Sequence, residues 1–187
     1  LIIAVGVRFS DRATGNGAKF AKNSKIIQLD PDSAEINKNV QTHHHIVGDA
    51  KRVLELLLEK AAPKQNDEWM KYVFSFKTET EYDEATDHLT PQQVLSSIAR
   101  ICPQDTIVAT DVGQHQMWAA QYVRHVKPRH FLTSGGLGTM GYGYGAAIGA
   151  KAAKPEAPVI HFTGDGSFHM NLNEACTAVS FGLPGVQ

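Results

Sequence analysis

The stretch from Ala157 to Gly182 restricts the fold more than any other part of this sequence. It starts with an apolar run, Val159–Thr163, and continues with the compact sequence Gly164-Asp165-Gly166-Ser167. Apolar residues at helical spacing follow, namely Leu172, Ala175, Cys176 and Val179. This order predicts a buried strand, a sharp turn and a helix that ends at Gly182 and Pro184. Alternating strands and helices favour an α/β fold with a parallel sheet.

Asp165 is the candidate functional residue of this stretch. In an open α/β sheet, ligands bind at the carboxyl ends of the strands, where this turn lies. Glycines on either side let the main chain approach a ligand closely, and N–H groups at the start of the next helix favour a phosphate. A carboxylate beside a phosphate predicts a bridging Mg²⁺. The alternative is a tight Gly-Asp-Gly turn that binds nothing.

Length and composition exclude several classes of protein. The 187 residues are 42% hydrophobic and 20% charged, which is enough for one ordinary domain or two small ones. A net charge of −1 argues against nucleic-acid binding, and no apolar run approaches the ~20 residues of a membrane span. Cys102 and Cys176 form neither a disulfide framework nor a metal motif, so we expect a reducing compartment, the cytoplasm. Because both ends interrupt apolar segments, we expect an internal piece of a longer polypeptide.

Three short apolar runs in residues 1–60 predict parallel strands whose ends meet at one crevice. They are Leu1–Gly6, Ile26–Asp30 and His45–Asp49, separated by segments of mostly helical length. Asp30 ends the second run, where dinucleotide-binding sheets place an acid on a ribose. A helix marked by Val53, Leu54, Leu57 and Leu58 is expected to pack and close this unit.

Arg8 and Arg12 follow the first predicted strand. Their guanidinium groups suit a pyrophosphate, and the alternative is a solvated surface loop of arginines and aspartates. His43, His44 and His45 are not expected to bind a metal, because consecutive residues of an extended segment point to opposite faces.

Residues 61–89 are predicted to be a linker that contains one short helix. Its polar ends bracket a helical face formed by Trp69, Tyr72, Val73 and Phe76. We expect this face to pack on a neighbouring domain, and a partner-binding helix is the alternative.

Residues 90–187 are predicted to form a second sheet unit. Thr90, Pro91 and Gln93 carry the signals of a helix start, followed by a stripe of Val94, Leu95, Ile98 and Ile101. A strand at Thr106–Thr110 leads into polar residues 111–118, which should face the same edge as Asp165.

The segment from Gly135 to Gly149 is rich in glycine and leads into a predicted helix, Ala146–Ala153. So much glycine costs backbone entropy, which indicates that the main chain approaches something closely. Gly141, Gly145 and Gly149 share a helix face and are interpreted as packing positions. Gly135, Gly136 and Gly138 are the better candidates for ligand contact.

Five motifs resemble those of the large catalytic chain of acetolactate synthase, a thiamine-diphosphate-dependent enzyme. They are GVRFSDRATG at 6–15, LDPDSAE at 29–35, TDVGQHQMWAAQ at 110–121, TSGGLGTMGYG at 133–143 and GDGSFHMN at 164–171. The resemblance covers nearly the whole chain. It implies two incomplete units: the C-terminal part of an FAD-binding middle domain (1–60) and, after the linker, the N-terminal part of a diphosphate-binding domain (90–187).

The resemblance also implies site residues. Thiamine diphosphate would be held by Gln114, His115, Gly138, Thr139, Met140, Asp165, Gly166 and Ser167. Within this set Asp165 would bind Mg²⁺, Met140 would keep the cofactor bent, and Gln114 and Met140 would serve catalysis. FAD would lie along Gly6, Val7, Arg8, Arg12, Ala13, Asp30, Pro31, Glu35, Gly48, Asp49 and Ala50, with Gln116 and Met117 reaching it from the second domain.

The implied reaction is decarboxylation of pyruvate and its condensation with a second 2-oxo acid, pyruvate or 2-oxobutyrate, in branched-chain amino-acid biosynthesis. A homodimer or tetramer, a small regulatory subunit and a cytoplasmic or plastid location are implied as well. The alternatives are another thiamine-diphosphate and FAD enzyme, such as pyruvate oxidase or glyoxylate carboligase, and an inactive binding module. We expect the 187-residue chain alone to make no acetolactate.

Overall fold

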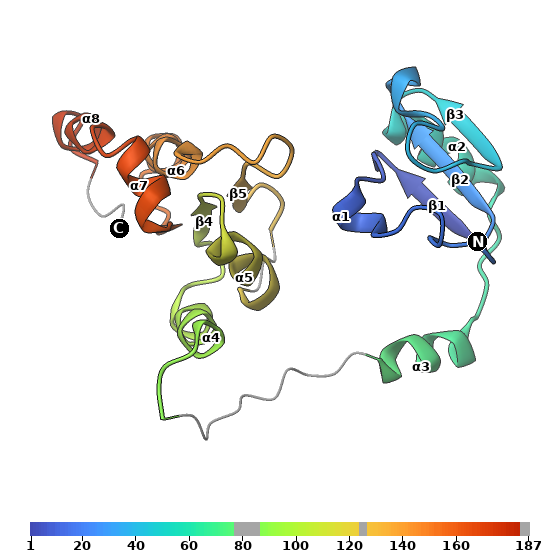
Figure 1. Ribbon diagram of the computed structural model, residues 1–187, viewed down its shortest axis with the longest axis horizontal. Helices are drawn as coiled ribbons and strands as arrows, with labels where there is room; N and C mark the ends of the chain where they lie inside the picture. The colour runs from blue at the N-terminus through green and yellow to red at the C-terminus, as the bar shows by residue number, and fades with distance from the viewer. Residues whose placement is uncertain (77–86, 124–126, 184–187) are drawn as a thin grey trace. The chain divides into compact units, whose positions relative to one another are not determined.

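The chain folds into two compact units, residues 1–77 and 78–187. A computed structural model describes residues 1–76, 87–123 and 127–183. Each unit holds one three-stranded sheet with parallel strands (Figure 1). The predicted α/β class with two parallel-sheet units is therefore confirmed. Within the described ranges, every helix is too short or too polar to cross a membrane.

The sheet of the first unit contains the three predicted strands. β1 (Ile2–Val5), β2 (Ile26–Asp30) and β3 (His44–Val47) lie in the order β1-β2-β3. Just beyond the strands, the Gly6 amide donates to the Leu29 carbonyl at 2.9 Å, and the Gly48 amide donates to the Asp30 carbonyl at 3.1 Å. The carboxyl ends of all three strands therefore meet at one edge, as the sequence predicts.

The connections between these strands are less helical than expected. They contain only the four-residue helix α1 (Asp11–Thr14) and a 3-10 helix (Ser33–Glu35). A fully buried glutamine on the middle strand, Gln28, fastens both connections instead. Its Nε2 donates to the carbonyl of Val7 at 3.1 Å and to that of Glu35 at 3.3 Å. The Gln28 side chain thus fastens connections that contain little helix.

Two helices complete the first unit, α2 (Ala50–Lys60) and α3 (Asp67–Ser75). The prediction that α2 packs through its apolar stripe is wrong, because the helix has no buried residue and Leu54, Leu57 and Leu58 are exposed. On α3, Tyr72 contacts Trp69 and Phe76, with ring centroids 5.6 and 4.8 Å apart, and all three rings are exposed. The expected packing of α3 on a neighbouring domain stays a prediction.

The sheet of the second unit has the order β5-β4-β6. β4 (Ile107–Thr110) and β6 (Val159–Phe162) match the predicted strands. β5 (Phe131–Thr133) was not predicted, because three residues are too few to show a period. Helix α4 (Pro91–Ile101) precedes β4, α5 (Gln114–Tyr122) lies between β4 and β5, and α6 (Tyr142–Ala153) lies between β5 and β6.

Alternating side chains of β4 pack against different helices. Ile107 and Ala109 cluster with Ala147 and Ala150 of α6. Val108, which points the other way, clusters with Leu95 of α4 and Ala119 of α5. Buried residues on both faces are typical of a parallel strand covered by helices on both sides.

Helix α4 starts as predicted. The Thr90 hydroxyl accepts from the Gln93 amide at 3.3 Å, and the Gln93 side chain accepts from the Thr90 amide at 2.9 Å, which is a complete capping box. The predicted stripe is wrong in part, because only Leu95 is buried. Val94 and Ile101 are 41% and 82% exposed, since only the Leu95 side of the helix packs, against α5 and Val108 of β4.

Thr90→Ala is expected to lower the free energy of unfolding of the chain by about 1 kcal/mol, because it leaves the Gln93 amide without its acceptor. Thr90→Ser keeps the hydroxyl and should have almost no effect. Urea unfolding followed by circular dichroism measures both. Equal losses for the two variants would show that the cap contributes nothing.

The prediction of one C-terminal helix is wrong in its bounds and in its buried face. Two short helices replace it, α7 (Asp165–Met170) and α8 (Glu174–Ser180). Leu172, Cys176 and Val179 are exposed, and the buried residue of α8 is Ala178. The predicted stop at Gly182 is confirmed: this glycine has φ +60°, and the Leu183 amide donates back to the Ala178 carbonyl at 2.9 Å. Pro184 and residues 185–187 lie outside the described residues.

The glycine-rich helix also differs from the prediction. α6 begins at Tyr142 rather than Ala146. A Cβ atom on Gly145 or Gly149 would meet nothing within 4 Å, so these two are not close-packing positions. The tightly packed glycine is Gly143, whose Cβ would lie 2.6 Å from the Asp111 amide nitrogen. Gly141 has φ +85° at the N-cap, where a Cβ would lie 3.1 Å from that of Met170.

Candidate functional site

A pocket of about 440 Å³ lies at the carboxyl ends of β4 and β6. Three segments line it: residues 112–118 after β4, Met140 before α6, and residues 163–167 after β6. Among the residues predicted to hold thiamine diphosphate, it brings together Gln114, His115, Met140, Asp165, Gly166 and Ser167. Residues far apart in the sequence therefore share the edge of the sheet where ligands of α/β folds bind.

Asp165 is the exposed carboxylate of this pocket. Its side chain has no hydrogen bond or ion pair with another residue that the structure describes. The nearby Met140 lies over the turn, because a Cβ atom on Gly166 would be 3.5 Å from the Met140 Cε. A free carboxylate that faces a pocket is available to bind a hard cation.

His115 lies against the main chain on the other side of the pocket. A Cβ atom added to Gly113 would lie 2.9 Å from the His115 Cε1, and one added to Gly164 would lie 3.4 Å from the same atom. The ring hydrogen-bonds to the main chain of Asp111, while its buried Nε2 has no partner among the residues described. An unsatisfied buried nitrogen at a pocket indicates a place for a polar ligand group.

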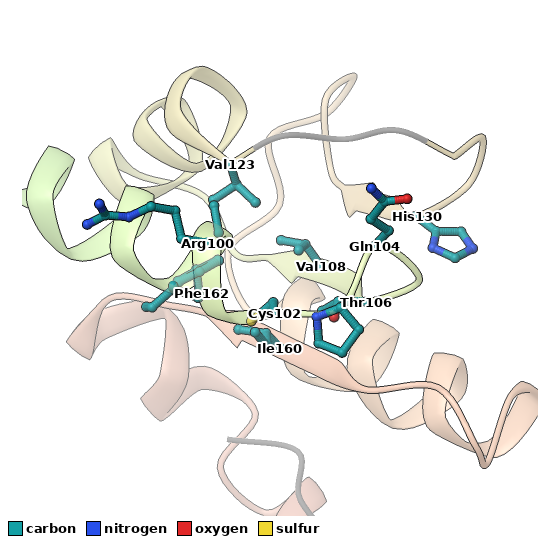
Figure 2. Close-up of a pocket in the computed structure, with 12 residues that line it drawn as sticks. Arg100, Cys102, Gln104, Thr106, Val108, Val123, His130, Ile160 and Phe162 are labelled. Atoms are coloured by element: carbon teal, nitrogen blue, oxygen red, sulfur yellow. The ribbon is translucent and has the colours of Figure 1, made fainter. Parts of the chain in front are cut away.

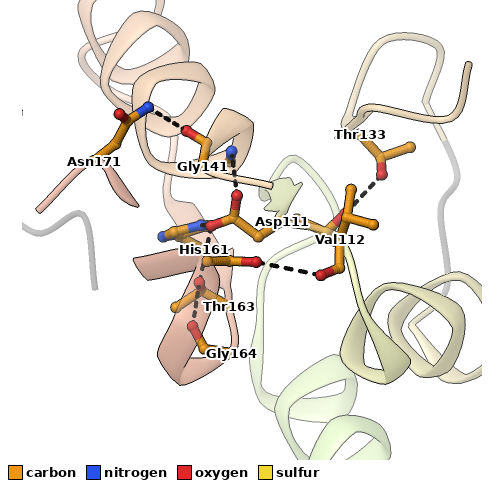
Figure 3. Close-up of polar contacts among 11 residues, drawn as sticks. Asp111, Val112, Thr133, Gly141, His161, Thr163, Gly164 and Asn171 are labelled. Atoms are coloured by element: carbon orange, nitrogen blue, oxygen red, sulfur yellow. Dashed lines mark hydrogen bonds and ion pairs between the residues drawn. The ribbon is translucent and has the colours of Figure 1, made fainter. Parts of the chain in front are cut away.

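Directly behind the pocket lies a buried polar network that the sequence reasoning missed (Figure 3). The Asp111 carboxylate, which has no exposed surface, accepts from the Gly143 amide at 2.9 Å, from His161 Nε2 at 2.9 Å and from the Thr163 hydroxyl at 2.8 Å. The one available signal was a histidine within the apolar run of β6, flanked by Ile160 and Phe162.

Two further hydrogen bonds hold the same region. The Ser167 hydroxyl donates to the Val112 carbonyl at 3.2 Å, and Asn171 Nδ2 donates to the Gly141 carbonyl at 2.6 Å. Figure 3 shows the second of these bonds between α7 and the start of α6. The segments after β4, before α6 and after β6 are therefore fastened to one another.

The electrostatics of the network follow from its burial. Burial alone would raise the pKa of Asp111, but hydrogen bonds from Gly143, Thr163 and His161 outweigh it and lower that pKa. Burial lowers the pKa of His161 and of His115, more than the Asp111 carboxylate raises either. Both rings are therefore neutral at neutral pH.

The lowered histidine pKa values predict a loss of stability in mild acid. Below the ordinary histidine pKa of about 6.5, the unfolded chain binds protons that the folded chain does not, so stability falls as the pH falls. We expect a lower urea midpoint at about pH 5.5 than at about pH 7.5, in a window well above the titration of Asp111. His161→Gln should reduce this difference, and the exposed control His44→Gln should not. A midpoint that rises on acidification would contradict the prediction.

Other predicted residues lie beside the pocket or away from it. A Cβ atom on Gly138, which has φ +67°, would be 3.9 Å from Val112 Cγ1, so this glycine is adjacent to the pocket wall. The Thr139 amide donates to Ser134 Oγ at 3.0 Å. Gln116 Nε2 donates to Thr133 Oγ1 at 2.7 Å, and Met117 is exposed. The predicted contact of these last two side chains with FAD stays a prediction.

The predicted FAD residues of the first unit follow the ends of its strands. Gly6–Ala13 come after β1, Asp30–Glu35 end or follow β2, and Gly48–Ala50 come after β3. Arg8 and Arg12 are exposed, and Asp49 caps α2 by accepting from the Arg52 amide at 2.9 Å. One oxygen of Glu35 meets Lys38 Nζ at 2.6 Å, while the other is buried without a partner in the described chain.

A second cavity of the same unit, about 280 Å³, contains none of the predicted site residues. It lies beside α4, and Val108, Val123, Ile160 and Phe162 form its apolar wall (Figure 2). The described residues contain no cluster of three or more histidine, cysteine, aspartate or glutamate side chains that could hold a metal. A cation at Asp165 would therefore need oxygen ligands from a bound molecule or from water, which is the usual arrangement for Mg²⁺.

Two family models match the chain, one in each unit. Residues 1–57 match the central domain of thiamine pyrophosphate enzymes, and residues 111–186 match their C-terminal TPP binding domain. The second match contains the whole pocket.

Curated relatives match the chain from end to end. It is 44% identical to the acetolactate synthase large subunit of Haemophilus influenzae, covering 100% of this chain and 34% of that protein. It is 47% identical to the large subunit of Corynebacterium glutamicum (98% and 31%) and 43% identical to the isozyme 3 large subunit of Escherichia coli (98% and 34%). The chain thus spans about a third of the length of these relatives. From both domain matches and these identities, the chain belongs to the thiamine pyrophosphate enzyme family, as a relative of acetolactate synthase large subunits.

Proposed function

We propose that the protein carrying this sequence is the catalytic large subunit of an acetolactate synthase. It would decarboxylate pyruvate and join the remaining two-carbon unit to pyruvate or 2-oxobutyrate, giving acetolactate or acetohydroxybutyrate for branched-chain amino-acid biosynthesis. The observation that carries this proposal is the pocket that unites Gln114, His115 and Met140 with the Gly164–Ser167 turn. The names of the relatives supply the reaction.

The residues of the pocket fit thiamine diphosphate and Mg²⁺. Asp165 offers a free carboxylate for the cation, with Gly166 and Ser167 beside it for the diphosphate. His115 offers a buried ring nitrogen that still needs a partner, and Met140 offers an apolar side chain to hold the cofactor bent. Gly138 and Thr139 would complete the wall. The cofactor, when bound, supplies the electron sink that decarboxylation needs.

FAD is the second cofactor of the proposal. Its support is the common edge of the first sheet, where Gly6, Asp30 and Gly48 follow one another across three strands. Arg8, in the loop after β1, and Arg12, on α1, are both exposed, and their guanidinium groups suit a pyrophosphate. Flavin absorbance in the purified protein would test this part.

The active protein is proposed to be a homodimer or tetramer that binds a small regulatory subunit, because the relatives are named large subunits. Two free cysteines, Cys102 and Cys176, suit the reducing cytoplasm, with a plastid as the alternative. Light scattering of the purified protein measures its oligomeric state.

The test is an assay with pyruvate, thiamine diphosphate and Mg²⁺, with and without FAD, in which the product is identified. The full-length protein that carries this sequence should form acetolactate, and adding 2-oxobutyrate should give acetohydroxybutyrate. Peroxide or acetyl phosphate as the product would instead indicate a pyruvate oxidase. Absence of any product would favour a binding module.

A further inference from the structure

The Asp111 carboxylate connects three separate chain segments. It directly follows β4, and its hydrogen-bond donors come from the first turn of α6 (Gly143), from β6 (His161) and from the residue after β6 (Thr163). All three bonds are 2.8 to 2.9 Å long, and the His161 side chain is only 3% exposed. The bonds from Gly143 and His161 are buried, and the bond from Thr163 is partly buried.

Each connected segment presents a pocket residue a few positions away. Gly143 comes three residues after Met140, and Thr163 comes two residues before Asp165. Asp111 itself comes four residues before His115, whose ring also hydrogen-bonds to the Asp111 main chain. A displacement at Asp111 would therefore move the sulfur, carboxylate and imidazole groups of the pocket relative to one another.

We propose that Asp111 is the positioning residue of the thiamine-diphosphate pocket, and that His161 acts with it by holding the carboxylate in place. Neither side chain touches the cofactor in this proposal, which rests on the proposed function of the pocket. Affinity for the cofactor then depends on the buried Asp111 carboxylate and the buried His161 ring.

The chemistry of the network suits this role. A carboxylate only accepts hydrogen bonds, so its two oxygens satisfy all three donors without a proton of their own. The ring of His161 is held flat against Tyr144 of α6, with centroids 5.7 Å apart and planes inclined by 20°, which fixes the direction of its N–H. Replacing the carboxylate leaves hydrogen-bond donors of Gly143, His161 and Thr163 without an acceptor. The energetic penalty of these unsatisfied groups destabilises the arrangement of the segments that carry them.

The test compares variants of the full-length protein that carries this sequence, with thiamine diphosphate and Mg²⁺ as the titrated probes. Asp111→Asn replaces one acceptor oxygen with an NH2 donor that faces another donor, and should weaken thiamine diphosphate binding about 10-fold or more, as loss of a supporting residue does at other sites. His161→Phe keeps the ring but removes the donor, and should also weaken binding. His161→Gln keeps a donor nitrogen and should restore binding to near that of the parent.

Controls separate positioning from general stability. Leu95→Ala removes a buried side chain of α4 that does not line the pocket, and should lower the unfolding midpoint while leaving cofactor affinity unchanged. At saturating cofactor, the Asp111 and His161 variants should regain most of their kcat, so the apparent KM for the cofactor carries the effect. Folded Asp111→Asn and His161→Phe proteins with parental affinity would overturn the proposal. If Asp111→Asn does not fold, the difference in cofactor affinity between His161→Phe and His161→Gln tests the proposal by itself. Absence of cofactor binding by the parent would instead overturn the proposed function.

Discussion

Gly143→Ala is expected to lower the free energy of unfolding of the second unit by about 3 kcal/mol or more, at the upper end of overpacking effects. The added methyl would lie 2.5 Å from His161 Nε2, 2.6 Å from the Asp111 amide nitrogen and 2.7 Å from the Thr110 carbonyl carbon. Two of these three atoms belong to the main chain of β4 and the loop after it, so a rotamer change does not relieve the clash. Helix and strand must separate, and the hydrogen bond from Gly143 to Asp111 is strained or lost.

The same helix supplies matched controls. Gly145 and Gly149 lie in α6 with open space around them, so alanine at either position only lowers the entropy of the unfolded chain and improves helix propensity. Each control is expected to raise the free energy of unfolding by about 0.5 to 1 kcal/mol. Chemical denaturation of the three variants side by side measures the expected loss of stability for Gly143→Ala and the expected gains for the two controls. A Gly143→Ala protein as stable as the Gly145→Ala protein would show that the contact between α6 and β4 is looser than the structure describes.

Local sequence signals predicted the elements that depend only on near neighbours. The capping box at Thr90, the glycine stop at Gly182 and the strands Ile26–Asp30 and Val159–Phe162 each follow from residues within one or two turns of chain. Parallel pairing followed from the alternation of strands with connecting segments. These features carry over into the structure because each is satisfied within its own segment.

Apolar periodicity was less informative about burial. It correctly located α2 and α4 but not the faces that are covered, because a stripe reports which side is apolar and not whether another element lies against it. Leu58 and Ile101, which both belong to predicted stripes, are 74% and 82% exposed. Each unit leaves these faces uncovered within the described residues.

The Asp111 network was beyond the reach of sequence patterns for a different reason. Its members are joined across 32 to 52 positions of the chain, so only the register of β4 beside β6 and the start of α6 bring them together. The glycine-rich segment shows the same limit. Its composition predicted a close approach, but which glycine makes that approach depends on where α6 crosses the sheet, and this placed Gly143 against β4 instead of Gly145 or Gly149.

In the full-length protein and on the proposed function, Asp165→Ala is expected to weaken Mg²⁺-dependent cofactor binding at least 100-fold, which corresponds to about 2.8 kcal/mol, with a matching loss of acetolactate formation at ordinary cofactor concentrations. Asp165 is the one carboxylate among the residues that line the pocket, so nothing nearby replaces it when Mg²⁺ must shed water for a protein ligand. Stability should hardly change, since the side chain is exposed and has no partner among the described residues.

Asp105→Ala removes an exposed aspartate from the turn before β4 and is the control for charge alone. Titration of thiamine diphosphate at several Mg²⁺ concentrations separates the two variants, because a ligand of the metal shifts the Mg²⁺ dependence and a remote charge does not. If a folded Asp165→Ala protein has the same Mg²⁺ dependence as the parent, Asp165 is not a ligand of the metal.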